Sequence, residues 1–185
     1  ITIFVRNIHV RFMRYLKIIF LTLFIVTCCG ACKLASITYS MTGASISPEV
    51  KTFSVDYFQN KSLLVVPYLS TLFTEKLKTY MRTKTSLKEM TDNNGDIRFS
   101  GEIVGYYQKP IDIQRDEVAT SNRLTIEIRV KYINTKDDKY DFDSRFSNYA
   151  DYDINADFDA IEEELITQIL DKIIDDIYNK ALVNW

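Results

Sequence analysis

The sequence predicts an α+β fold in which two helices pack on one face of a four- to five-stranded, mostly antiparallel sheet. Several segments alternate apolar and polar residues, which is the period of half-buried strands. Two other segments repeat apolar residues at helical spacing, and two helices suffice to cover one face of a sheet. The expected order is β-α-β-β-β-β-α. Hydrophobic residues make up 46% and charged residues 26% of the 185 residues, so the composition is that of a folded domain.

The first strand and the first helix follow a polar stretch that ends at Pro48. Residues 53–57 alternate apolar and polar side chains, which predicts a strand. Pro67 suits the first position of a helix. The apolar residues after it recur at helical spacing, so we expect a helix over 67–83.

A short extended piece over 85–90 and a turn over 92–96 lead into three longer strands. The glycine and asparagines of the turn tolerate positive φ. The first long strand, 97–107, is interrupted at Gly101 and Gly105, where we expect a bulge or a close backbone approach.

The second and third long strands are expected to form an antiparallel hairpin. Residues 124–132 alternate most regularly, and 140–146 continue the pattern after a turn at 134–138. From Ile161 the period becomes helical for about 24 residues, or about 36 Å. The apolar residues of this helix form two adjacent columns, which predicts one broad buried face. The columns are Ile161, Leu165, Ile169, Ile173, Ile177, Ala181 and Ile166, Leu170, Ile174, Tyr178, Leu182.

Residues 1–31 are expected to be a signal peptide region with Met13 as the true start. This stretch holds four basic residues and no acidic one. The run Ile18–Thr27 follows the basic residues as an apolar h-region and is too short to span a bilayer. Its removal leaves a mildly acidic chain with a net charge of about −6.

The segment Cys28-Cys29-Gly30-Ala31-Cys32 resembles the lipobox of bacterial lipoproteins. This resemblance implies cleavage before Cys32 and a covalent diacylglycerol and N-acyl lipid on that residue. Cys29 stands where an aliphatic residue is usual, so Cys28 and Cys29 remain alternative acceptors. The other alternative is an ordinary secreted protein with cysteines near its cleavage site. We expect a lipidated tether over 32–48 and a single domain over 49–185.

Few catalytic groups remain after Cys32. The only histidine, His9, and all three cysteines lie in the first 32 residues. Nucleophile-elbow, P-loop and dinucleotide-binding motifs are absent from the sequence. We therefore expect no enzyme activity and no cofactor apart from the lipid on Cys32. The net acidity and the lack of a basic run argue against nucleic-acid binding.

A modest basic patch is the first candidate ligand site. Arg98, Arg129, Lys131 and Arg145 fall on the strand face opposite the apolar one, where they could receive an anionic ligand. The alternative is scattered solvated charge.

No metal site is expected, although one loop offers a weak calcium alternative. Asp151, Asp153, Asn155 and Glu162 have the spacing of an EF-hand loop, but Ala156 replaces the glycine of its sharp turn. The alternative is that the polar residues start the last helix, with Asp159 and Glu162 spaced like a capping box.

From about Thr38 to Trp185 the chain resembles the lipopolysaccharide-assembly lipoprotein family LptE. The segments that carry this resemblance are Thr42–Ile46, Phe73–Leu77, Asp92–Asp96, Phe99–Ile103, Asn122–Ile126, Phe146–Tyr152 and the end of the last helix at Asn184-Trp185.

The resemblance implies two helices on a four-stranded sheet in a lipid-anchored protein at the periplasmic side of the outer membrane. It also implies that the domain plugs and helps assemble an LptD-type outer-membrane β-barrel and assists delivery of lipopolysaccharide to the outer leaflet, without catalysis. The alternative is an envelope lipoprotein of the same fold that serves as a binding or assembly module for a different partner or ligand.

Overall fold

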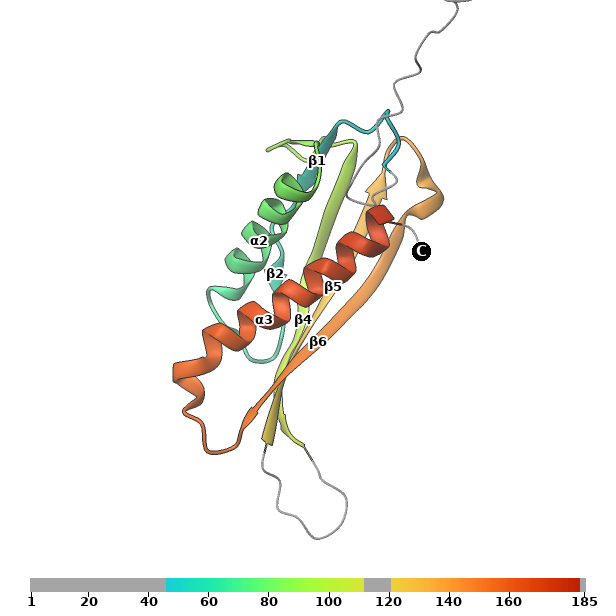
Figure 1. Ribbon diagram of the computed structural model, residues 1–185. Helices are drawn as coiled ribbons and strands as arrows, with labels where there is room; N and C mark the ends of the chain where they lie inside the picture. The colour runs from blue at the N-terminus through green and yellow to red at the C-terminus, as the bar shows by residue number, and fades with distance from the viewer. Residues whose placement is uncertain (1–45, 112–120, 184–185) are drawn as a thin grey trace, which may run out of the picture. The chain divides into compact units, whose positions relative to one another are not determined.

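The computed structural model describes residues 46–111 and 121–183, in which a sheet carries two long helices on one face (Figure 1). The two helices are α2 and α3. The strands are β1 (Thr52–Val55), β2 (Gln59–Asn60), β3 (Lys88–Glu89), β4 (Ile97–Pro110), β5 (Ser121–Asn134) and β6 (Phe142–Asp153). The helices are α2 (Leu69–Lys84) and α3 (Phe158–Tyr178). Two short helical segments complete the fold, the 3-10 helix η1 (Asp138–Tyr140) and the π-helix η2 (Asn179–Val183).

The sheet has six strands in the order β3-β1-β4-β5-β6, and β2 also pairs with β4. The long strands β4, β5 and β6 are antiparallel neighbours, which confirms the expected hairpin. The pairs β1–β4, β2–β4 and β1–β3 are parallel. The α+β class is therefore confirmed, and the sheet is mixed because the short strands enter it in parallel.

Both helices start and end close to their expected positions. α2 begins two residues after Pro67, which lies in the turn before the helix. The C-terminal helix also forms as expected, with its last five residues wound as a π-helix. Apart from the half-buried Ile161, every residue of its two apolar columns is buried.

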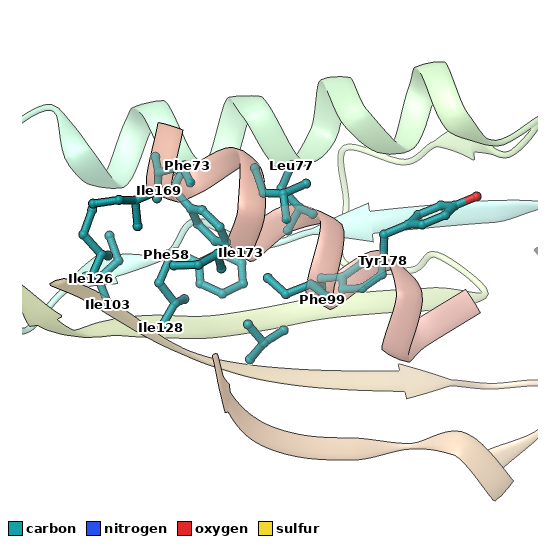
Figure 2. Packing of buried hydrophobic residues seen from close by; sticks show 14 of the residues in the cluster. Phe58, Phe73, Leu77, Phe99, Ile103, Ile126, Ile128, Ile169, Ile173 and Tyr178 are labelled. Atoms are coloured by element: carbon teal, nitrogen blue, oxygen red, sulfur yellow. The ribbon is translucent and has the colours of Figure 1, made fainter. Parts of the chain in front are cut away.

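The core lies between the two helices and the sheet (Figure 2). Phe58, next to β2, and Phe73 on α2 meet edge to face with ring centroids 4.9 Å apart. Ile128 and Ile173 are fully buried on the sheet side and the helix side of this core. Each such side chain contributes about 1.5–3 kcal/mol when it is fully buried.

Gly95 and Gly101 allow close backbone approaches, and Gly105 lies at a shift in strand register. A Cβ at Gly101 would lie 2.0 Å from the carbonyl oxygen of Arg129, and the register of β4 against β5 shifts between Ile103 and Gly105. These are the close approach and the bulge that the sequence predicts. Gly95 has no positive φ; instead, a Cβ there would lie 2.5 Å from the backbone nitrogen of Ser54.

The signal peptide region, Met13 and the candidate lipidation sites Cys28, Cys29 and Cys32 lie outside the described residues. Within the part of the chain that the structure describes, no helix is both long enough and apolar enough to cross a membrane.

Candidate ligand-binding face

The face of the sheet opposite the helices carries the predicted basic residues. Alternation along β5 places Ile128 and Val130 in the core, whereas the residues that alternate with them, Arg129 and Lys131, are exposed. Arg145 on β6 is also exposed. The structure therefore brings the predicted residues of β5 and β6 together on one surface, which we call the open face.

Arg129 and Arg145 stand directly opposite each other in the ladder between β5 and β6. Like charges in this position are destabilising. Arg129 donates two hydrogen bonds of 2.8 Å to the carboxylate of Asp143, which raise the pKa of Arg129 and lower that of Asp143. Arg145 makes no salt bridge in the described part of the chain.

Lys131 is also left without an ion pair in the described residues. It stands opposite Asp143, which is already bonded to Arg129. Glu102 stands opposite Arg129 from the β4 side but pairs with Lys61, with 2.6 Å between Nζ and Oε2. The nearby acids are thus engaged, and positive charge is in excess around Arg129.

Arg98 lies at the edge of the same surface and is half-buried. It is the register partner of Ser54 on β1, and both the Arg98 Nε and the Ser54 Oγ are buried without a hydrogen-bond partner among the described residues. Buried polar groups of this kind usually have a partner.

The predicted set Arg98, Arg129 and Lys131 therefore gathers on one face, next to the Arg145 that the sequence also pointed to. Arginines bind planar or tetrahedral oxyanions by two parallel hydrogen bonds, and lysine adds a point charge. The arrangement suits an anionic ligand that carries more than one negative group.

Sequence reasoning missed the second arginine–acid pair of the open face. Arg123 donates to both carboxylate oxygens of Asp151, at 2.6 and 2.9 Å, and its guanidinium lies 3.5 Å from the ring centroid of Tyr149. These hydrogen bonds lower the pKa of Asp151. The signal that could have found this pair is the register of the hairpin, which places Arg123 opposite Asp151.

The loop with calcium-like spacing is engaged in other contacts. Asp151 is bonded to Arg123, the Asp153 carboxylate accepts from the backbone N–H of Asn155, and Glu162 accepts from the Tyr106 hydroxyl. Within residues 46–111 and 121–183, no cluster of three or more His, Cys, Asp or Glu side chains is arranged to hold a metal ion.

The capping box expected from Asp159 and Glu162 is wrong. α3 begins at Phe158 with Asp157 at the N-cap position, so Asp159 is inside the first turn, where it can favour the helix dipole but cannot cap. Glu162 turns to Tyr106 instead, and this contact raises the pKa of the tyrosine together with burial, which is the larger effect.

Two further surface features are an exposed apolar segment and a groove between the helices. Between β2 and α2, Leu63 is fully exposed and Leu64 and Val65 are 56% and 62% exposed. Between α2 and α3 runs a groove of about 340 Å³ whose lining includes Thr79 and Asp171.

Comparison with known proteins identifies the family of the chain. The model of the LptE family, described as lipopolysaccharide-assembly, matches residues 50–181. A search of curated proteins gave no match.

Among the solved structures that resemble the chain are three lipoproteins of low sequence identity. They are a minor lipoprotein from Acinetobacter baumannii (12% identity, TM-score 0.48, 71% of this chain and 91% of that one), an uncharacterized lipoprotein B from Nitrosomonas europaea (11%, 0.45, 69% and 79%) and the rare lipoprotein B from Shewanella oneidensis (10%, 0.40, 70% and 90%). The assignment rests on the family match, not on these structures.

Proposed function

The chain belongs to the LptE family of lipopolysaccharide-assembly lipoproteins, and from that premise we propose that it plugs and helps assemble an LptD-type β-barrel and assists insertion of lipopolysaccharide into the outer leaflet. The family match over residues 50–181 carries the proposal. The family is one of binding and assembly proteins of the cell envelope rather than of enzymes. The proposed role is accordingly binding.

The open face supports the ligand part of this proposal. Lipopolysaccharide presents phosphates, and Arg98, Arg129, Lys131 and Arg145 form a surface with excess positive charge. The like-charge pair of Arg129 and Arg145 would be relieved by a bound phosphate.

The rest of the surface supports a protein partner. Barrel lumens are polar, and the open face pairs its remaining charges in salt bridges such as Arg123–Asp151. Leu63, Leu64 and Val65 are three consecutive apolar residues with exposed side chains, and exposed apolar surface is typical of a contact site.

The anchor part of the proposal concerns Cys32. Lipid chains on this residue would hold the domain at the periplasmic side of the outer membrane, since two or more chains anchor a protein stably. The variant Cys32→Ala should incorporate no labelled fatty acid. Continued labelling would move the anchor to Cys28 or Cys29.

Co-purification from detergent-solubilised outer membranes tests the partner. We expect a large β-barrel to be recovered with the tagged chain in a fixed ratio. Recovery without any such barrel would contradict the plug role and favour the alternative, an envelope lipoprotein of the same fold with a different partner.

Binding of purified lipopolysaccharide tests the ligand face. The triple variant Arg98→Gln, Arg129→Gln, Lys131→Gln should bind at least about tenfold more weakly, because three charge-assisted contacts are removed. The control Lys78→Gln, Arg82→Gln, Lys84→Gln removes the same charge from α2 and should bind within about twofold of the parent. An equal loss of affinity in both variants would show that net charge, and not the open face, determines the binding.

A further inference from the structure

The part of the open face near the end of β4 carries a second excess of positive charge. Lys109 on β4 stands directly opposite Arg123 on β5, so like charges meet there. Arg123 is paired with Asp151 on β6. Lys109 is exposed and makes no salt bridge in the described part of the chain. An anionic group of a ligand would therefore find an unpaired cation at this position.

The neighbouring row of the sheet carries an aromatic ring at either side. Tyr107 on β4 and Tyr149 on β6 are both register partners of Thr125 on β5. Neighbouring strands lie about 4.8 Å apart, so the Cα atoms of the two tyrosines are about 10 Å apart. Tyr149 is 45% exposed, and Tyr107 is half-buried. We call Tyr107, Thr125 and Tyr149 the tyrosine row.

Both rings of the tyrosine row are held in place by cations of the same molecule. The Lys109 Nζ lies 5.1 Å from the centroid of the Tyr107 ring, and the Arg123 guanidinium lies 3.5 Å from the centroid of the Tyr149 ring. A cation of this kind sits over one face of the ring. The exposed remainder of Tyr149 is thus preorganised for contact, which lowers the entropy cost of binding.

Glu127 adds a hydrogen-bond acceptor beside the tyrosine row. Its Oε1 accepts from the Tyr107 hydroxyl at 2.8 Å. Its register partner on β6 is Ser147, which is exposed. Carboxylates and hydroxyls bond the hydroxyl groups of a sugar, and an aromatic face packs against its C–H groups. This row and the tyrosine row together offer what a sugar ring requires.

The spacing of the two basic positions favours a ligand with charge at separated points. Arg123 and Arg129 are six residues apart on β5, which is about 20 Å along a strand, and Thr125 lies between them. A lone phosphate reaches only one of the two positions. A purely apolar ligand would bury Lys109 and Glu127 without partners, which is costly. An acidic saccharide carries both the separated charges and the rings between them.

We propose that the tyrosine row, with Lys109 and Glu127, binds the acidic sugars of lipopolysaccharide, while the basic patch around Arg129 binds the phosphates of its lipid part. The identity of the ligand rests on the proposed function, and the inference adds a separate saccharide subsite to the open face. Lys109 pairs with an anionic group of the sugars. Tyr149 packs against the C–H groups of a sugar ring, and Glu127 accepts from its hydroxyls.

Mild acid hydrolysis of one lipopolysaccharide yields a water-soluble saccharide that tests this subsite alone. Saturation-transfer NMR should show transfer from the protein to the sugar protons, because Tyr149 contacts them. Tyr149→Leu should reduce this transfer and weaken saccharide binding at least about threefold. The matched control Tyr140→Leu should change neither quantity. Tyr140 lies between β5 and β6, is 39% exposed and also has a lysine, Lys139, over its ring.

Lipid A, the other product of the hydrolysis, separates this inference from the proposed function. The double variant Lys109→Gln, Tyr149→Leu should bind intact lipopolysaccharide and the saccharide at least about fivefold more weakly. It should bind lipid A within about twofold of the parent, because the patch around Arg129 is unchanged. The control Lys139→Gln, Tyr140→Leu should bind all three probes as the parent does.

The outcomes that contradict the two proposals differ. A parent chain that binds lipid A but not the saccharide would overturn the saccharide subsite and leave the proposed function standing. An equal loss of lipid A and saccharide in the double variant would also overturn it, as would unchanged binding of all probes with loss of the β-barrel in co-purification, which would assign the tyrosine row to the barrel wall. A parent chain that binds the saccharide but not lipid A would contradict the proposed phosphate site alone.

Discussion

The two faces of the sheet are built from the same strands but differ in burial and in charge. On β5, Ile128 faces the helices and is fully buried, whereas its neighbour Arg129 faces outward and is exposed. One face is covered by α2 and α3 and holds the core. The other holds charges, two directly opposed like-charge pairs (Arg129 with Arg145 and Lys109 with Arg123) and a half-buried arginine whose Nε has no partner among the described residues. This contrast places the stabilising contacts in the covered face, and our proposal assigns recognition to the open face.

Truncating the covered face should have the largest effect on stability. Phe99→Ala on β4 removes a fully buried ring that lies 5.2 Å from the Tyr132 ring, so we expect a loss of about 3–5 kcal/mol in the free energy of unfolding. Its neighbour Ser100→Ala on the open face is the control and should stay within about 0.5 kcal/mol. Urea denaturation of both variants measures the difference, and similar losses would contradict the division between faces.

Gly101→Ala should be the next most harmful change. The new Cβ would lie 2.0 Å from the Arg129 carbonyl oxygen and 2.7 Å from the Phe58 ring, so β4 and β5 must separate. Overpacking of this kind costs about 1–3 kcal/mol or more. Gly105→Ala, whose Cβ would meet only the Glu127 side chain at 3.1 Å, is the matched control. Equal melting temperatures for the two variants would show that the approach at Gly101 is not constraining.

Asp96 ties the start of β4 to β1 and makes stability depend on pH. Its carboxylate accepts from the N–H groups of Lys51 and Thr52 and pairs with Lys136, and these contacts, led by the Lys51 N–H, hold its pKa well below the ordinary range. Asp96→Asn should lower the free energy of unfolding at pH 7 by about 1–3 kcal/mol.

The sign of the pH effect follows from the lowered pKa. The stabilisation is fully present above the pKa of the unfolded chain, about 3.9, and is lost as pH falls through the lower pKa of the folded state. The difference in the free energy of unfolding between the parent and Asp96→Asn should therefore decrease only at acidic pH. A gap that narrowed between pH 8 and 6 would point to a different group.

Relief of one like-charge pair should give the smallest effect, with the opposite sign. Arg145→Thr removes the repulsion with Arg129 and should raise the free energy of unfolding by about 0.2–1 kcal/mol. The same variant should bind lipopolysaccharide more weakly. Unchanged ligand affinity would remove Arg145 from the binding surface.

Local periodicity was enough to predict the elements with strong patterns. The regular alternation of β5 and the two apolar columns of α3 determined their type, their buried faces and the hairpin with β6. Strand β2 was missed because two residues carry no period. The parallel pairing of β1 with β4 was missed because it depends on how the chain runs back along α2 before β4 begins. The local sequence pattern carries no information on that path.

The candidate site was predictable in composition but not in pairing. Alternation alone placed Arg98, Arg129 and Lys131 on one face. Which of the basic residues are neutralised depends on register, since Asp143 bonds to Arg129 and leaves Lys131 and Arg145 without a salt bridge in the described part of the chain. The contact between Ser54 and Arg98 joins strands far apart in the sequence.

Alkylation of single cysteines with and without lipopolysaccharide tests most directly whether the open face is the binding face. The chain would carry serine at Cys28, Cys29 and Cys32 and one reporter, either Ser100→Cys on the open face or Thr79→Cys in the groove between α2 and α3. We predict that lipopolysaccharide slows alkylation at position 100 at least about fivefold and leaves position 79 unchanged. Protection at position 79 alone, or equal protection at both positions, would contradict the account.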